Sequence, residues 1–153
     1  LVGSEMCIRD SAYPQAVGGR ADDKNDRRVA GEEETMNLEK LYQETGGDMA
    51  GAVRRLGSIA AVERFLRMFA GDDTFAMLQA AISAGDGQRA FRAAHTLKGL
   101  AANLGLVQLG QAASALTEAL RGGDMQRASA LYPETAAAYR QACAAIEDLE
   151  TDA

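Results

Sequence analysis

From Asn37 onward the sequence alternates apolar, alanine-rich stretches with short breaks that contain glycine, and this pattern constrains the fold most. Asp or Ser follows most of the breaks; these residues are favoured as helix N-caps, whereas glycine is favoured where a helix ends. The pattern predicts helices over residues 38–44, 48–56, 59–69, 75–83, 87–104, 106–120 and 125–149, the last interrupted or kinked at Pro133. Because short connections make successive long helices antiparallel, we expect an all-α fold: an antiparallel four-helix bundle with short N-terminal helices.

Residues 1–35 lack the apolar periodicity of the rest of the chain. They carry five basic and eight acidic side chains, three of the acids in the run Glu32 to Glu34. Such a segment buries too little apolar surface to offset the entropy lost on ordering. We therefore expect residues 1–35 to be a disordered or non-native leader, with Met36 as the start of a helical bundle that extends over residues 36–150.

The overall composition excludes several classes of partner. The chain is 47% hydrophobic and 5% aromatic, which suits an alanine-rich helical protein better than a β-sandwich. Its net charge of −6 opposes binding to nucleic acid or to an anionic membrane surface. Two cysteines, Cys7 and Cys143, provide neither a disulfide framework nor the spacing of metal ligands, and this suits a reducing compartment.

One uncharged stretch, residues 99–117, is long enough to be compared with a membrane span. Gly105 and Gly110 divide it, and several polar side chains interrupt it, so two ordinary helix segments are the better interpretation. Residues 1–10 contain no apolar core of a secretory signal. We therefore expect a cytoplasmic location.

The predicted helix over residues 87–104 contains the only histidine of the chain, His95. At about 100° per residue, the apolar side chains of this helix gather on one side, which should face the core. His95 falls on the opposite side. The core stripe consists of Ala90, Ala93, Leu97, Leu100, Ala101 and Leu104, and the residues around His95 are Gln88, Arg92, Lys98, Gly99 and Ala102.

Two neighbours suggest that the His95 face has a function. Lys98 lies about one turn further on, so its ammonium group can approach an anion held by the imidazole. Gly99 lies four residues on, where a side chain would crowd the imidazole. A glycine inside a helix costs about 0.5–1 kcal/mol relative to alanine, so the missing side chain indicates a need for space.

The segment AFRAAHTLKGLAANLG, Ala90 to Gly105, resembles the signature of histidine-containing phosphotransfer (HPt) domains, in which His-x-x-Lys-Gly is followed by a further glycine. The resemblance extends over most of residues 36–149. It implies that His95 is the phospho-acceptor, that Lys98 supports the phosphoryl group, and that Gly99 leaves room for an incoming receiver domain. Members of the family are four-helix bundles that carry phosphoryl groups between receiver domains of response regulators or hybrid histidine kinases in two-component relays.

The resemblance also implies which groups come from the partner. Family members have no ATP site, and the divalent metal and acidic cluster needed for transfer belong to the receiver, so we expect no cofactor and no metal on this chain. The imidazole of an ordinary histidine is largely neutral and nucleophilic at neutral pH, so no further base is needed. The transition state then needs mainly alignment and charge neutralisation.

Five further residues are candidates for receiver docking. Phe91 is the apolar candidate, although burial by a neighbouring helix is an equal alternative; the polar or small candidates are Gln88, Arg92, Ala102 and Asn103, which could equally be solvated. Four methionines occur at helical spacing and are expected in the core: Met49, Met68, Met77 and Met125.

Two other classes of function remain open. A helical module could dock receivers without carrying phosphate. An enzyme is the remoter alternative, because the sequence lacks an Arg-His-Gly element, a GxxxxGK nucleotide loop and a His-Glu-x-x-His pair.

Overall fold

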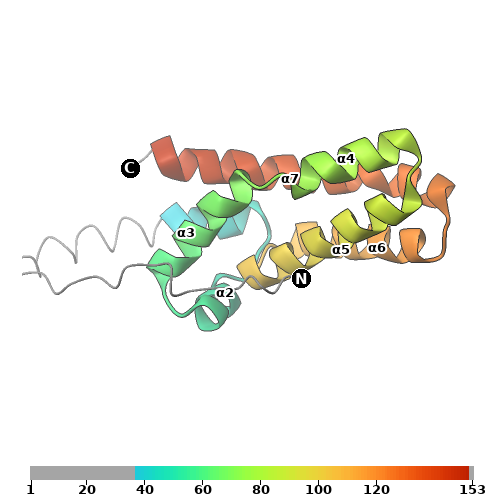
Figure 1. The fold of residues 1–153 in the computed structure, drawn as a ribbon. Helices are drawn as coiled ribbons and strands as arrows, with labels where there is room; N and C mark the ends of the chain where they lie inside the picture. The colour runs from blue at the N-terminus through green and yellow to red at the C-terminus, as the bar shows by residue number, and fades with distance from the viewer. Residues whose placement is uncertain (1–36, 152–153) are drawn as a thin grey trace, which may run out of the picture. The chain divides into compact units, whose positions relative to one another are not determined.

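The computed structural model describes residues 37–151, which are helical throughout apart from short turns (Figure 1). No strand occurs in this part of the chain, so the predicted all-α class is confirmed. The expectations for residues 1–35 lie outside the described residues. The helical segments are residues 37–44, α2 (Met49–Leu56), α3 (Ile59–Ala70), α4 (Thr74–Ala84), α5 (Gly87–Leu104), α6 (Val107–Arg121) and α7 (Met125–Thr151).

Most helices begin at the caps that the sequence predicts. The side chains of Asp48, Ser58 and Asp86 each accept a hydrogen bond from the backbone N–H three residues further on. Asp124 does the same before α7, with the N–H of Arg127 at 3.0 Å. These bonds satisfy N–H groups that have no partner inside the helix. The helix boundaries are therefore set largely by local sequence.

The last helix, α7, differs from the prediction of an interruption at Pro133. It continues through this residue as a single element of 27 residues. A proline inside a helix removes the N–H that would bond to the carbonyl four residues earlier, here that of Ser129. Both Pro133 and Ser129 are exposed, so water can take the place of the missing donor, while buried residues on both sides, Ala128 and Ala136, hold the helix against the core.

Most of the core lies between α3, α4, α5, α6 and α7, and the helix over residues 37–44 and α2 add buried side chains to it. Fully or almost fully buried side chains from these five helices meet there: Leu66, Leu78, Leu97, Leu116 and Ile146. α5 packs against α4 on one side and α6 on the other, and α7 packs against α6 and contacts α3 and α4. Figure 1 shows α5 and α6 running beside each other, with α7 behind α4. α5 is thus packed against neighbours on two sides, and its remaining side faces outward.

Two of the four methionines are not in the core. Met68 and Met77 are 53% and 59% exposed, whereas Met49 and Met125 are partly buried against it. The expectation for Met68 and Met77 is wrong because each stands next to a stripe residue rather than in the stripe. The buried stripe of α4, for instance, includes Leu78.

The end of α5 is fastened to the N-terminal helices. The hydroxyl of Tyr42 donates a hydrogen bond of 2.5 Å to the carbonyl of Leu104, and burial raises the pKa of Tyr42 to about 12. The N–H of Asp48 donates to the carbonyl of Gly105 at 2.7 Å. Gly105 has a φ of +68°, and a Cβ there would collide with the backbone carbonyl of Asp48. Glycine is therefore required at this joint.

Candidate functional site

The two faces of α5 lie as the sequence predicts. Its buried residues are Ala90, Ala93, Ala94, Leu97, Ala101 and Leu104. Leu100 is partly buried, and Ala94 joins the stripe although the sequence analysis did not include it. His95 is exposed, on the side of α5 away from the leucines. A solvent-accessible imidazole on the outward face of α5 is therefore available to a partner.

The space beyond His95 is open. Gly99 is exposed, and among the described residues no heavy atom lies within 4 Å of the place where its Cβ would stand, apart from its chain neighbours and the backbone of α5 itself. Its φ is not in the left-handed region, so the backbone does not require glycine here. Lys98 is half-buried, and Thr96 is exposed. The open space therefore results from the absence of a side chain at position 99.

Phe91 makes a ring contact with the histidine. Its ring is almost parallel to the imidazole of His95, with 5.9 Å between the centroids and 13° between the planes. This distance is within the range of stacked aromatic pairs. Phe91 is also partly buried against the core, which confirms the burial alternative raised from the sequence, while its role in docking stays a prediction. The Phe91 ring therefore lies beside the imidazole on an otherwise open face.

Arg121, the last residue of α6, is the site residue that the sequence analysis missed. The Cζ atom of its guanidinium lies 5.7 Å from the centroid of the Phe91 ring, and a nitrogen of the same group lies 3.5 Å from Glu118. The first distance is within the range of cation–π contacts. Arg121 is 26 residues from His95 in the sequence, so no motif spacing indicates it; only the packing of α6 on α5 does.

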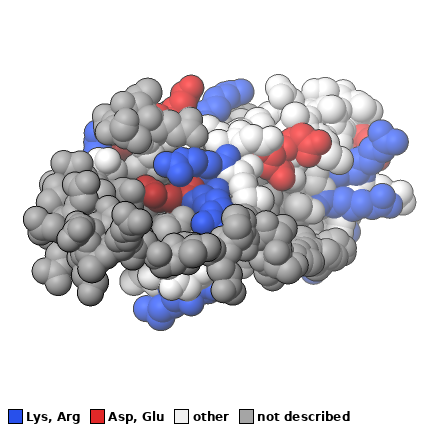
Figure 2. Space-filling view, turned by 60° about the vertical axis from the view of Figure 1, so that its left-hand side comes forward, with Lys and Arg blue, Asp and Glu red and all other residues white. Residues whose placement is uncertain are grey.

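The surroundings of His95 are locally basic although the chain is acidic. α5 contains Arg89, Arg92 and Lys98 and no acidic residue. Arg89 pairs with Asp86 at 3.5 Å, whereas Arg92 and Lys98 have no ion pair within residues 37–151. Elsewhere the signs are mixed: Figure 2 shows basic and acidic side chains interspersed on one face. The two unpaired cations of α5 are therefore available to neutralise an anion or an acidic partner.

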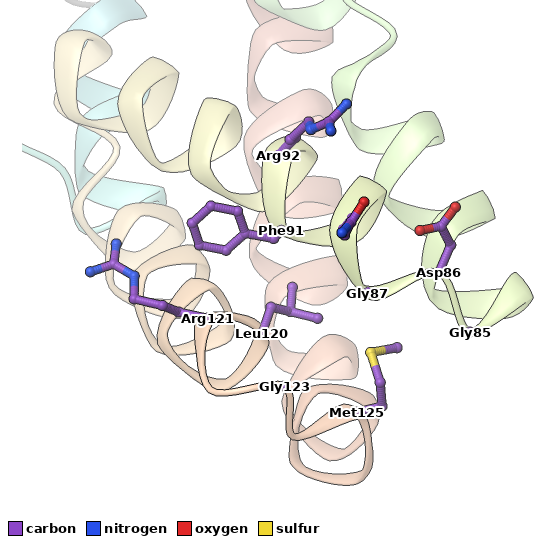
Figure 3. A pocket seen from close by; sticks show the side chains of 10 residues that line it. Gly85, Asp86, Gly87, Phe91, Arg92, Leu120, Arg121, Gly123 and Met125 are labelled. Atoms are coloured by element: carbon purple, nitrogen blue, oxygen red, sulfur yellow. The ribbon is translucent and has the colours of Figure 1, made fainter.

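A hollow of about 560 Å³ opens at the start of α5 (Figure 3). Three of the five candidate docking residues, Gln88, Phe91 and Arg92, line it. The other two do not: Ala102 and Asn103 are exposed near the opposite end of α5, where the carbonyl of Asn103 accepts a hydrogen bond from Arg55. The full lining consists of Gly85, Asp86, Gly87, Gln88, Phe91, Arg92, Leu120, Arg121, Gly123 and Met125.

Within residues 37–151, no three His, Cys, Asp or Glu side chains lie close enough together to bind a metal ion. Over the same range, every helix is too short or too polar to span a lipid bilayer.

Comparison with known proteins identifies a family. The family model of the Hpt domain matches residues 33–150. The searches of curated proteins and of solved structures gave no match. The matched residues include all of α2 to α6 and nearly all of α7, together with the exposed histidine of α5. Because the match covers well over half of the sequence, the chain belongs to the Hpt domain family.

Proposed function

We propose that this chain is a phosphorelay carrier: His95 accepts a phosphoryl group from the aspartyl phosphate of a receiver domain or hybrid kinase and passes it to another receiver. Membership of the Hpt family itself implies phosphotransfer in two-component signalling. The observation that supports the assignment to His95 is its position, exposed on α5 with open space over Gly99. It is also the only histidine in the sequence.

The transfer needs only one nucleophilic nitrogen from this chain. The unprotonated ring nitrogen of His95 attacks phosphorus with its lone pair, and the bond between phosphorus and the aspartyl oxygen breaks. That oxygen keeps the electron pair and leaves as a carboxylate. The positive charge gained by the ring stands beside the negative phosphoryl oxygens. Alignment and charge neutralisation dominate such a reaction, and both depend on the surroundings of the ring.

Each neighbour of His95 has a proposed part in that reaction. Phe91 limits the orientation of the imidazole through the stacked contact. Lys98, one turn away on α5, neutralises charge on the phosphoryl group. Gly99 admits the aspartyl phosphate, because no other side chain of residues 37–151 fills the space where its own would be. The divalent metal that assists the transfer belongs to the receiver, and this chain supplies no cofactor.

The proposal extends to the fold and the location. We take the helices around the core to form the antiparallel four-helix bundle of the family, in which α5 presents His95 outward. We also place the carrier in the cytoplasm, where receivers and hybrid kinases have their phosphorylated domains.

The test is labelling by phosphorylated receivers. A panel of receiver domains carrying ³²P-phosphate is incubated with the chain, and label on histidine is recognised because it is labile in acid and stable in base. We expect label on the wild-type chain and none on His95→Gln. Thr96→Ala, which changes an exposed neighbour on the same helix, is the matched control and should be labelled normally. Binding of receivers without any label would instead identify a docking module that carries no phosphate.

A further inference from the structure

The imidazole of His95 lies beside the face of an aromatic ring. The ring of Phe91 is stacked on it, with 5.9 Å between the centroids and 13° between the planes. The faces of an aromatic ring carry the negative part of its quadrupole, and the edge carries the positive part. His95 therefore lies on the side of Phe91 that attracts positive charge.

A cation already lies over the same ring. The Cζ atom of Arg121 is 5.7 Å from the centroid of the Phe91 ring, within the distance at which a ring face attracts a cation. Figure 3 shows the Phe91 side chain projecting from α5, with the guanidinium of Arg121 beside its ring. Phe91 is partly buried against the core, which holds the ring in place. Its ring is thus arranged as an electrostatic partner for positive charge near the histidine.

The proposed reaction places a positive charge on the imidazole. When one ring nitrogen of His95 bonds to phosphorus, the ring is positive until its other nitrogen releases its proton to water. The transition state carries part of this charge. A group that stabilises the charge there, and does so less in the neutral imidazole, raises the rate of transfer.

The helices around the histidine offer little negative charge to balance it. α4 and α5 contain no acidic residue, and the one acidic residue of α6, Glu118, pairs with Arg121 at 3.5 Å. The charged residues of α5 are all basic: Arg89, Arg92 and Lys98. Cations beside His95 favour the phosphoryl oxygens and oppose a positive charge on the ring. The face of an aromatic ring can offset this opposition, because it attracts positive charge without pairing with the cations as a carboxylate would.

We propose that Phe91 has an electrostatic part in phosphotransfer: the face of its ring stabilises the positive charge that the imidazole of His95 acquires when it bonds to phosphorus. This inference rests on the proposed function, since it presumes that His95 is phosphorylated. It goes beyond the orientation of the imidazole. A ring of the same shape with a weaker negative face orients His95 equally well and stabilises the charge less.

Fluorinated phenylalanines test this role while the shape of the ring is nearly conserved. Each fluorine withdraws electrons and weakens the negative potential of the ring face. Phenylalanines that carry one, two or three fluorine atoms are introduced at position 91 of the full chain by nonsense suppression. The same series replaces Phe75 as the matched control, since this buried ring of α4 stacks on Tyr139 at 4.0 Å. Far-UV circular dichroism checks that each variant is folded.

The rate of label transfer to His95 is measured with two phosphodonors. One is phosphoramidate, a small donor whose bond between phosphorus and nitrogen breaks as the imidazole attacks, so that ammonia leaves with the electron pair. The other is a phosphorylated receiver that labels the wild-type chain. Because the proposed effect acts on the imidazole itself, the rates with both donors should change in the same order.

We expect the labelling rate to fall with each fluorine added at position 91, by about two- to fivefold for three fluorines, and to stay at the wild-type value throughout the Phe75 series. A rate that is independent of fluorination at position 91 overturns the electrostatic role and leaves the proposed function standing.

Two other results also overturn the electrostatic role. One is a fall of the same size in the Phe75 series, which reports a general effect of fluorine on the fold. The other is a fall with the receiver while the phosphoramidate rates stay constant, which reports an effect on docking. If only one donor labels the wild-type chain, its rates alone decide. If neither donor labels His95 of the wild type, the proposed function fails, and this inference fails with it.

Discussion

Replacing Gly99 by alanine should stabilise the fold and slow phosphotransfer at the same time. The site is exposed, its φ is not left-handed, and among the described residues no heavy atom beyond the local backbone lies within 4 Å of the added Cβ. The substitution therefore introduces neither strain nor a clash. It removes the conformational entropy penalty of a glycine inside a helix, worth about 0.5–1 kcal/mol. For a domain of this size that gain corresponds to a rise in melting temperature of roughly 2–6 °C.

The functional effect of the same change should have the opposite sign. A methyl group at position 99 stands one turn beyond His95, in the open space through which, in the proposed function, an aspartyl phosphate approaches. Gly99→Gln extends further into that space, so transfer should slow more in Gln than in Ala. Thermal unfolding measures the first effect, and the rate of label transfer from a phosphorylated receiver measures the second.

The matched control is Gly110→Ala, which also replaces a glycine inside a helix. A Cβ there would lie 3.7 Å from that of Ala101, an ordinary packing distance, so the variant should gain stability and keep the wild-type transfer rate. Transfer rates that are unchanged in both Gly99→Ala and Gly99→Gln would show that Gly99 does not provide clearance. Unfolding of both would show that Gly99 is a packing glycine.

Three further predictions concern stability and are read by urea unfolding. Tyr42→Phe should lose about 1 kcal/mol at neutral pH, because the carbonyl of Leu104 loses its donor. Since burial raises the pKa of Tyr42 from 10.0 to about 12, the neutral phenol stabilises the fold below pH 10, and this contribution is lost as the pH rises through 12. The stability of wild type relative to Tyr42→Phe should therefore fall by roughly 2 kcal/mol over that range, so that the variant becomes the more stable of the two at high pH; a constant difference would contradict the reasoning. Gly105→Ala should cost about 2 kcal/mol or more, because alanine is strained at a φ of +68° and its Cβ meets the carbonyl of Asp48; a neutral effect would contradict the role of this joint. Pro133→Ala should raise stability by up to about 3 kcal/mol, because it restores a donor inside α7, and a loss of stability would show that the proline is needed there.

The sequence predicts well what depends on neighbouring residues. Caps such as Ser58 and Asp86 bond to N–H groups three positions away, so each helix start is encoded within one turn. The same is true of the faces of α5, because a regular helix fixes the angle between His95 and Leu97. The exposed histidine and the open space at Gly99 could therefore be predicted.

Contacts between distant segments could not be predicted in this way. Tyr42 and Leu104 are 62 residues apart, and nothing in either local sequence indicates their hydrogen bond. Arg121 reaches Phe91 only because α6 packs on α5. The same packing brings residues of both helices together around the hollow. The helical spacing of Met68 and Met77 wrongly predicted that both lie in the core. A shift of one residue moves a side chain by about 100° around a helix, which is enough to move it from the core to the solvent.

The two ends of α5 are held in unequal ways, and this bears on how the helix moves. Its C-terminal end is fastened to the N-terminal helices at Leu104 and Gly105, and by the guanidinium of Arg55. Its first turns border an open hollow and are capped by the partly exposed Asp86. Local opening of a structure begins where few buried contacts resist it. We therefore expect fraying of α5 to start at its N-terminal end and to decrease toward Leu104, so that His95 lies between a loosely held and a firmly held end of the helix.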